Sequence, residues 1–153
     1  MSDTESNDGP IDLGALPSYL GYQLRQAQAA VFRDFARIMA EVGVSPGQFS
    51  LLTLVEANPG ISQTTLALTY GLDKSTLSYS VNELVKRDLI HRTRRNSDRR
   101  FYGLELTDGG SATLRRATAV VETQERRMDA ALEPGERGQL LALLTRVAGA
   151  LER

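Results

Sequence analysis

The chain of 153 residues contains no cysteine, no tryptophan and a single histidine, His91. The lack of cysteine excludes disulfides, thiolate metal sites and thiol-based redox sensing. One imidazole and no glycine-rich phosphate loop also argue against an enzyme, because catalysis needs several such groups brought together. We therefore expect no catalytic residue, no metal and no cofactor.

The sequence also lacks an apolar run long enough to cross a bilayer, and its first residues lack the basic and apolar parts of a secretory signal. These absences predict a cytoplasmic protein that does not engage a membrane. The length and the hydrophobic content of 41% fit one globular domain. Residues 1–16 carry four acidic side chains and no basic one, which predicts a flexible acidic tail.

Positive charge is concentrated in one region although the whole chain has a net charge of −1. Residues 74–100 contain eight Lys and Arg against three acidic residues, a local net charge of +5, and five of the eight are arginines within residues 92–100. A clustered basic surface is typical of a protein that binds nucleic acid. The plainer alternative is a solvated charged face, which most charge runs are.

Apolar residues recur at steps of three and four near the N-terminal end, at Leu20, Leu24, Ala27, Val31, Phe35, Ile38 and Val42. This spacing places them on one face and predicts a long helix over about 17–41. Such a helix exceeds what a small core can cover, so part of its apolar stripe is available to a partner chain.

Three shorter helices are predicted downstream by a shared pattern at their starts. Ser45, Ser62 and Asp73 are N-cap residues, and each lies between two apolar residues spaced as a hydrophobic staple. Gly71 ends the second of these helices directly before the third. Two short helices joined by so tight a turn predict a helix-turn-helix, whose second helix enters the DNA major groove.

The third helix, over about 73–88, has two distinct faces. Leu77, Val81, Leu84 and Val85 form the apolar one, and Ser75, Tyr79, Asn82 and Lys86 follow the opposite one. Short hydroxyls, amides and amines at a helix start can reach phosphates or base edges. The alternative is that the hydroxyls only satisfy the helix start, where such residues are common.

A β-hairpin is predicted over 89–94 and 100–106, because Tyr102, Leu104 and Leu106 alternate with Gly103 and Glu105 as one buried face requires. A hairpin after a recognition helix is a wing, and arginines at its tip suit the minor groove and its phosphates. Asp98 is predicted to brace the tip. The predicted DNA-binding residues are Ser62, Gln63, Thr64, Lys74, Ser75, Thr76, Ser78, Tyr79, Asn82, Lys86, Arg94, Arg95, Arg99 and Arg100.

The wing segment DRRFYGLELTDGG, with Asp98, Arg100, Leu104, Thr107 and Gly110 at their positions, resembles the wing signature of the MarR family of bacterial transcription regulators. Residues 66–92 are similar to that family's recognition segment. The resemblance implies a mostly α-helical winged helix-turn-helix with about six helices, a two- or three-stranded wing and dimerisation helices at both ends. We accordingly predict four parts of the chain, which are 1–16 (tail), 17–44 (first dimerisation helix), 45–107 (DNA-binding lobe) and 108–153 (last dimerisation helices).

A second apolar stripe supports the last of these parts. Thr107 can cap a long helix that carries Leu114, Val121, Met128 and Leu132, and the residues EPGE at 133–136 interrupt it before Leu140. The resemblance implies a homodimer on a palindromic operator, and paired half-sites favour a twofold dimer. Packing of these faces within one chain is the alternative.

The resemblance also implies a small aromatic or carboxylate effector, and residues 16–35 and 45–60 look similar to regulators of aromatic-acid catabolism, including sensors of hydroxycinnamoyl-CoA thioesters. Candidate effector-binding residues are Tyr19, Tyr22, Arg25, Arg33 and Arg37, which offer aromatic walls and anion partners unless they only line the core or face solvent. The predicted function is a ligand-responsive repressor released from its operator by the effector. The alternative is a winged helix that binds protein and not DNA.

Overall fold

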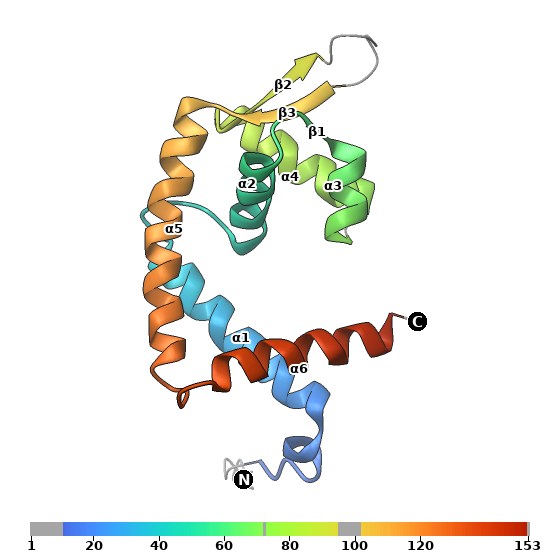
Figure 1. Ribbon diagram of the computed structural model, residues 1–153, viewed down its shortest axis with the longest axis vertical. Coiled ribbons are helices and arrows are strands. Elements are labelled where there is room, and N and C mark those ends of the chain that lie inside the picture. The colour runs from blue at the N-terminus through green and yellow to red at the C-terminus, as the bar shows by residue number, and fades with distance from the viewer. Residues whose placement is uncertain (1–10, 72, 95–101, 153) are drawn as a thin grey trace, which may run out of the picture. The chain divides into compact units, whose positions relative to one another are not determined.

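The computed structural model describes residues 11–71, 73–94 and 102–152 (Figure 1). Within them the chain forms six α-helices, one 3-10 turn and three strands, as expected for a mostly helical winged fold. In chain order the elements are η1 (Leu16–Ser18), α1 (Leu20–Ile38), α2 (Pro46–Ala57), β1 (Ile61–Ser62), α3 (Gln63–Tyr70), α4 (Lys74–Lys86), β2 (Ile90–Arg94), β3 (Tyr102–Leu106), α5 (Asp108–Asp129) and α6 (Glu136–Leu151).

The chain divides into two compact units, of which the first ends at Arg33 and the second begins at Asp34, inside α1. The first helix is shorter than the predicted range of 17–41. Pro17 lies in η1, and Tyr19 has an extended backbone, so α1 begins only at Leu20. At its other end the chain turns through Gly43, whose φ of 69° favours glycine, and α1 stops at Ile38.

The helix starts in the second unit follow the predicted caps. The side chain of Ser45 accepts a hydrogen bond from the backbone N–H of Gln48, and the Gln48 side chain returns one to the Ser45 backbone, which completes a capping box. Ser62 accepts from the backbone N–H of Thr65 and Thr107 from that of Gly110. Each cap satisfies an amide that has no partner within its helix, and so fixes where the helix begins.

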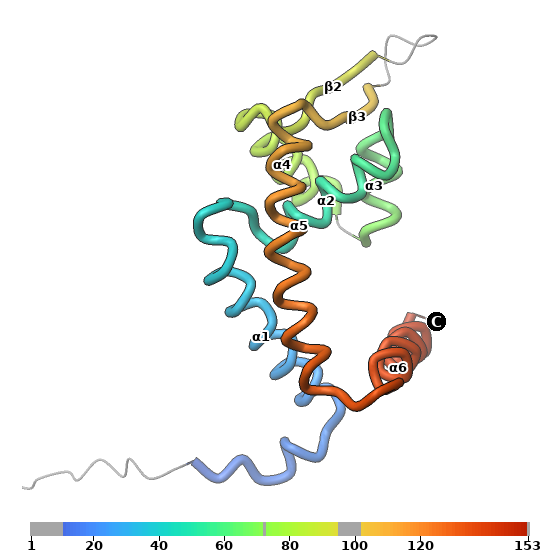
Figure 2. Tube along the Cα trace, turned by 60° about the vertical axis from the view of Figure 1, so that its left-hand side comes forward, coloured from blue at the N-terminus to red at the C-terminus, as the bar shows by residue number. Residues whose placement is uncertain are grey.

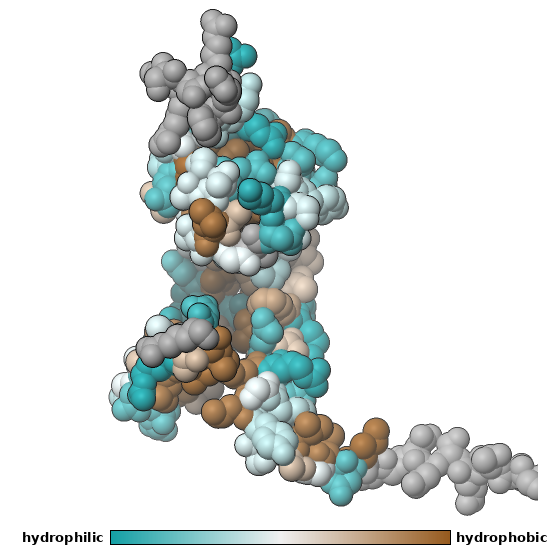
Figure 3. Space-filling model, turned by 90° about the vertical axis from the view of Figure 1, so that its right-hand side faces the viewer, coloured by the Kyte–Doolittle hydropathy of each residue, from teal (hydrophilic) through white to brown (hydrophobic). Residues whose placement is uncertain are grey.

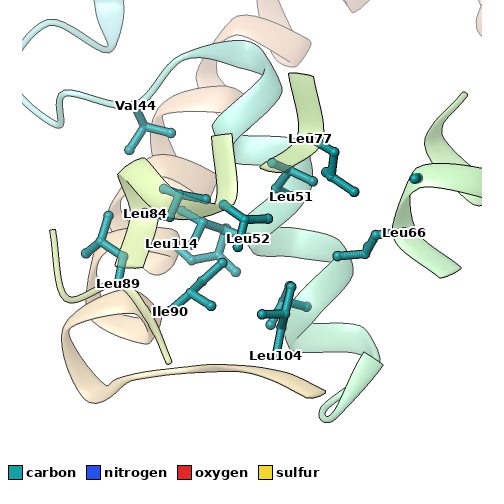
Figure 4. Packing of buried hydrophobic residues seen from close by; sticks show 13 residues of the cluster. Val44, Leu51, Leu52, Leu66, Leu77, Leu84, Leu89, Ile90, Leu104 and Leu114 are labelled. Carbon is teal, nitrogen blue, oxygen red and sulfur yellow. The ribbon is translucent and has the colours of Figure 1, made fainter. Parts of the chain in front are cut away.

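One apolar core holds these short elements together (Figure 4). Its buried side chains come from α2, α3, α4, β2, β3, α5 and the turns before α2 and β2, and point toward a common centre. They are Val44, Leu51, Leu52, Val55, Leu66, Ala67, Leu77, Val81, Leu84, Leu89, Ile90, Leu104 and Leu114. A smaller cluster joins Phe35 and Met39 to Ala117 of α5. Because α4 and the wing share one core, the lobe fixes the position of each against the other.

The sheet is antiparallel with strand order β1-β3-β2, so the wing is three-stranded. Ile90 lies opposite Leu106 and Arg94 opposite Tyr102. The predicted alternation is wrong at one end of β3, where Tyr102 is 47% exposed and Gly103 is buried. The backbone of Gly60 crosses here, and a Cβ on residue 103 would lie 2.6 Å from its carbonyl oxygen.

The start of α5 is fixed to the turn after α4. The Thr107 hydroxyl donates a hydrogen bond of 2.6 Å to the carbonyl of Asp88, and the Thr107 amide donates to the carbonyl of Leu89. From there α5 runs as one unbroken helix of 22 residues (Figure 2). It ends at Asp129, so Leu132 lies beyond the helix on which it was predicted.

Helix α6 follows a turn at Gly135 and keeps its apolar side chains exposed. Arg137, near its start, forms ion pairs with Glu125 and Asp129 of α5. Leu140, Leu141, Leu143 and Leu144 are 40–54% exposed. In Figure 3 apolar side chains gather along α6, whereas the visible face of the lobe is mostly polar. The apolar stripe of α6 is therefore not used within the described chain.

None of the helices in the described ranges combines the length and the hydropathy that a bilayer span requires.

Replacement of Gly110 by alanine tests the fixed start of α5. A Cβ at this position would lie 1.9 Å from the Leu89 carbonyl oxygen. We expect Gly110→Ala to lower the free energy of unfolding by about 2 kcal/mol or more, because neither backbone can yield easily. Gly47→Ala is the matched control, since Gly47 also lies in a first helical turn and has no atom within 4 Å of an added Cβ. Urea unfolding should show this control unchanged or stabilised by up to about 0.5 kcal/mol.

Candidate nucleic-acid interface

The turn between α3 and α4 brings the starts of both helices together. Gly71 ends α3 with a φ of 65°, in the left-handed region, which permits the sharp change of direction. A small hollow of about 100 Å³ lies between the two helices and is lined by Gln63, Thr64, Ala67, Lys74 and Leu77. Three residues predicted to bind DNA, Gln63, Thr64 and Lys74, therefore meet at one place.

Asp73 caps α4 with four hydrogen bonds. Its carboxylate accepts from the backbone N–H of Ser75 and of Thr76, at 3.0 and 2.9 Å, and from both of their hydroxyls. The hydroxyl of Ser75, followed by that of Thr76, holds the pKa of the Asp73 carboxyl well below its usual range. Both hydroxyls thus serve the cap, the alternative left open by the sequence, and their protons are not available to phosphates.

The outer face of α4 is otherwise polar and exposed. Leu77, Val81 and Leu84 turn inward and are buried, which leaves the opposite side of the helix to solvent. Tyr79 is 70% exposed, and Asn82 and Lys86 follow it on the same face. The predicted contact residues Lys74, Ser75 and Thr76 are also exposed, whereas Ser78 and Ser62 are half-buried at the edges.

Lys86 forms an ion pair of 2.8 Å with Glu83, one helical turn away. The hydrogen bond from Lys86 to Glu83 raises the pKa of the lysine, so its ammonium remains charged at neutral pH. An exposed pair of this kind contributes little to stability. A phosphate can therefore replace Glu83 as the partner of Lys86 at small cost.

The wing strand β2 has two different faces. His91 and Thr93 point to one side, where His91 lies 3.7 Å and Thr93 3.4 Å from the carboxylate of Glu105. Ile90, Arg92 and Arg94 alternate with them and share the other side, on which Ile90 enters the core. Arg94 is exposed, as predicted. The predicted tip residues Arg95, Asp98, Arg99 and Arg100 lie outside the described residues.

Arg92 joins the wing to α4. Its Nη2 donates a hydrogen bond of 2.7 Å to Oδ1 of Asn82, and both side chains are exposed. Arg92 is not one of the contact residues that the sequence predicted. Its position two residues after Ile90 could have indicated which side of β2 it occupies, but nothing local identifies its partner.

Comparisons with known proteins place these features in a family. The sequence profile described as the MarR family matches residues 42–100. A Thauera aromatica protein assigned to transcriptional regulation of the hcr operon is 39% identical over 135 residues, which cover 88% of this chain and 81% of that protein. The chain belongs to the MarR family.

Solved structures agree with this membership over nearly the whole chain. The transcriptional repressor CouR bound to a 23-mer DNA duplex is 42% identical, has a TM-score of 0.86, and is matched over 92% of this chain and 99% of its own. CouR bound to p-coumaroyl-CoA is 39% identical with a TM-score of 0.83, over 91% of this chain and 98% of its own. The winged-helix MarR fold predicted from the sequence is confirmed.

The five candidate effector residues of this MarR-family chain fall in both units. Tyr19, Tyr22, Arg25 and Arg33 belong to the first, in which Gln26 donates a hydrogen bond to the Tyr22 hydroxyl and the Arg25 guanidinium lies 5.9 Å from the centre of the Tyr22 ring. Arg37 belongs to the second and pairs with Asp34 at 2.5 Å. Arg37 thus already has an anionic partner within the chain.

Asp34 is the centre of a charged cluster that the sequence analysis missed. Arg37 and Arg127 donate to its carboxylate, Arg127 at 2.8 and 3.0 Å, and so does the buried side chain of Gln124 at 3.1 Å. Arg37, followed by Arg127, lowers the pKa of Asp34 to about 2. The Asp34 cluster stabilises the fold at pH values above the usual pKa of the carboxyl. This stabilisation is lost as the pH falls toward about 2.

Within the described ranges, no group of three or more His, Cys, Asp or Glu side chains could hold a metal ion.

The cap of α4 can be tested with Asp73→Ala and, as a control, Asp73→Ser, which keeps a capping oxygen. We expect the alanine variant to unfold at lower urea and the amides of Ser75 and Thr76 to exchange hydrogen faster, with serine restoring most of both. The folded pKa of Asp73 is depressed, so its contribution is complete above about pH 3.8 and lost at lower pH. The difference between wild type and Asp73→Ala should therefore be constant from pH 8 to 5 and shrink below about 3.8. A constant difference down to pH 3 would contradict the role of the charge.

Proposed function

We propose that this MarR-family chain is a repressor that binds a palindromic DNA operator and is released from it by a small effector. The observation that carries the proposal is the joined surface of α4 and β2. The exposed face with Tyr79, Asn82 and Lys86 continues through the Arg92–Asn82 hydrogen bond to Arg94. A helix with polar side chains that is flanked by a cationic strand matches a major groove bordered by phosphates.

The contact residues divide by chemistry into two groups. Lys74, Lys86 and Arg94, with the predicted tip arginines, would neutralise phosphates regardless of sequence. Tyr79 and Asn82, with the edge residue Ser78, would meet base edges. Gln63 and Thr64, beside Lys74, would contact the backbone near the start of α4. Ser75 and Thr76 would take part mainly through the cap that sets the position of this helix.

The proposed active form is a homodimer. The exposed leucines of α6 support it, because a row of half-exposed apolar side chains on one helix needs a partner surface. A second copy supplies such a surface in a symmetric way, and it also provides a second α4 for the other half of a palindrome. The dimerisation role predicted for the N-terminal helix stays a prediction.

An aromatic acyl-CoA is the proposed effector. The support is the similarity to CouR bound to p-coumaroyl-CoA. Tyr19, Tyr22, Arg25, Arg33 and Arg37 remain the candidate binding residues. Effector binding would favour a spacing of the two lobes that no longer matches successive grooves.

A catalytic role is not proposed. The histidine at position 91 lies beside Glu105 on a wing strand. Thr93, on the same strand, donates a hydrogen bond to the same carboxylate, and MarR-family regulators act by occupancy of DNA. Steric blockade of a promoter needs only such occupancy, which favours a repressor over an activator.

Titration with duplex DNA at two salt concentrations tests the proposal. We expect a loss of affinity of about 1000-fold or more between 50 and 200 mM salt, as for a protein with six or more phosphate contacts, and two chains per palindromic duplex. Arg94→Ala should weaken binding to all sequences and reduce the salt slope by about 1. Tyr79→Ala should change which sequence is preferred. Arg116→Ala, an exposed arginine of α5, is the control that should leave binding unchanged.

A response that does not depend on salt would contradict DNA binding and favour a winged helix that binds protein.

Release of DNA by small molecules tests the effector. We expect p-coumaroyl-CoA to dissociate the protein from its operator, and CoA and p-coumarate each to fail at the same concentration. Arg33→Ala should raise the thioester concentration needed for release and leave DNA affinity unchanged in its absence, because it removes an anion partner far in sequence from the recognition helix. Release by the free aromatic acid alone would contradict the acyl-CoA and indicate a carboxylate effector.

A further inference from the structure

The hydrogen bond between Arg92 and Asn82 restricts what the recognition helix can offer to DNA. Arg92 lies on β2 and Asn82 on α4, and the guanidinium Nη2 is 2.7 Å from the amide oxygen Oδ1. Both side chains are exposed on the face that continues to Tyr79 and Arg94. The pair therefore lies within the proposed DNA-binding surface, and not behind it.

The chemistry of the two groups determines the orientation of the amide. A guanidinium carries only hydrogen-bond donors, so the atom of Asn82 that faces Arg92 must be the acceptor, Oδ1. The amide is planar, and Nδ2 consequently points away from Arg92. Nδ2 has no hydrogen-bond partner among the described residues. Asn82 thus presents two N–H donors outward while its oxygen is engaged.

We propose that Arg92 fixes Asn82 as a hydrogen-bond donor, so that this position of α4 contacts an acceptor oxygen or nitrogen of the DNA and disfavours cytosine. In the major groove cytosine presents only the N4 donor, which can pair with an asparagine oxygen but not with its N–H groups. With Oδ1 turned toward Arg92, the partners open to Nδ2 are N7 of adenine or guanine, O6 of guanine, O4 of thymine, or a phosphate oxygen. This inference rests on the proposed function of DNA binding.

The surroundings leave Arg92 available for this role. The acidic residue on β3 nearest to β2, Glu105, is turned toward His91 and Thr93 on the other face of the strand. The acidic residue that neighbours Asn82 on α4, Glu83, pairs with Lys86. Neither carboxylate bonds to Arg92, so the guanidinium keeps Asn82 as its partner within the described part of the chain.

Loss of Arg92 should therefore change specificity as well as affinity. Without the guanidinium the Asn82 amide can rotate by half a turn and present its oxygen, its nitrogen or both. Cytosine then becomes an acceptable partner, because the freed oxygen can accept from its N4. A residue that only contacts phosphate would not have this effect, because its removal weakens binding to all sequences alike.

The experiment measures the affinity of four proteins for a set of operator duplexes in which each half-site base pair is varied in turn. The proteins are wild type, Arg92→Ala, Asn82→Ala and the double variant, and Arg94→Ala serves as the control for uniform weakening. If the acceptor is a base, we expect wild type to disfavour cytosine at one position by about 10-fold, within the range for a base contact. Arg92→Ala should reduce this discrimination to less than about 3-fold, and the double variant should discriminate no less than Asn82→Ala alone.

Two arms distinguish a base from a phosphate as the acceptor. For a base, Asn82→Ala abolishes the discrimination at one position only. For a phosphate, Asn82→Ala weakens binding to every duplex alike, and a methylphosphonate at one backbone position weakens wild type but not Asn82→Ala. Either result supports Asn82 as a donor, and in both the effects of Arg92→Ala and Asn82→Ala are not additive.

Two results would overturn the inference while DNA binding stands. One is a wild-type preference for cytosine that Asn82→Ala removes, and the other is strict additivity of the two single substitutions. Arg92→Lys adds a further comparison, since it keeps the charge and one donor and should retain more discrimination than Arg92→Ala. If wild type binds no duplex with salt-dependent affinity, the proposed function itself fails and the inference fails with it.

Discussion

Burial of one face of α4 is the constraint on which the proposed interface depends. Leu77, Val81 and Leu84 are almost completely buried. Successive residues of a helix are about 100° apart, so anchoring three of them fixes the rotation of the whole helix. Tyr79 and Asn82 must then face outward. Ile90 enters the same core, and the face of β2 that it shares with Arg92 is thereby set against α4.

The polar side chains of α4 fall into two groups, one that fixes the start of the helix and one that is proposed to contact DNA. The hydroxyls of Ser75 and Thr76 donate to Asp73 and so define where the helix begins. The side chains left for direct contact lie further along, at Tyr79, Asn82 and Lys86. A helix can be placed accurately in a groove only if its start is fixed, and the first turn of α4 fixes that start.

The sequence predicted well what depends on neighbours in the chain. Caps at Ser45, Ser62 and Asp73 and the glycine that ends α3 need only a few adjacent residues, and the structure confirms them. Contacts between distant segments could not be predicted in this way. Gly60 against Gly103, Arg92 with Asn82 and Asp34 with Arg127 join residues 10–93 positions apart. One neighbouring pair was also missed, since Asp34 and Arg37 lie three residues apart on α1, a spacing at which opposite charges can pair.

The attachment of α5 to the turn after α4 has a mechanical consequence. Thr107 is bonded to the carbonyls of Asp88 and Leu89, and Gly110 leaves no space beside Leu89. Bending between α5 and the turn after α4 would have to break those hydrogen bonds, so a tilt of α5 would also tilt α4. A displacement of about 1 Å at the far end of this helix of 22 residues would then change the orientation of α4 without unfolding any part of it.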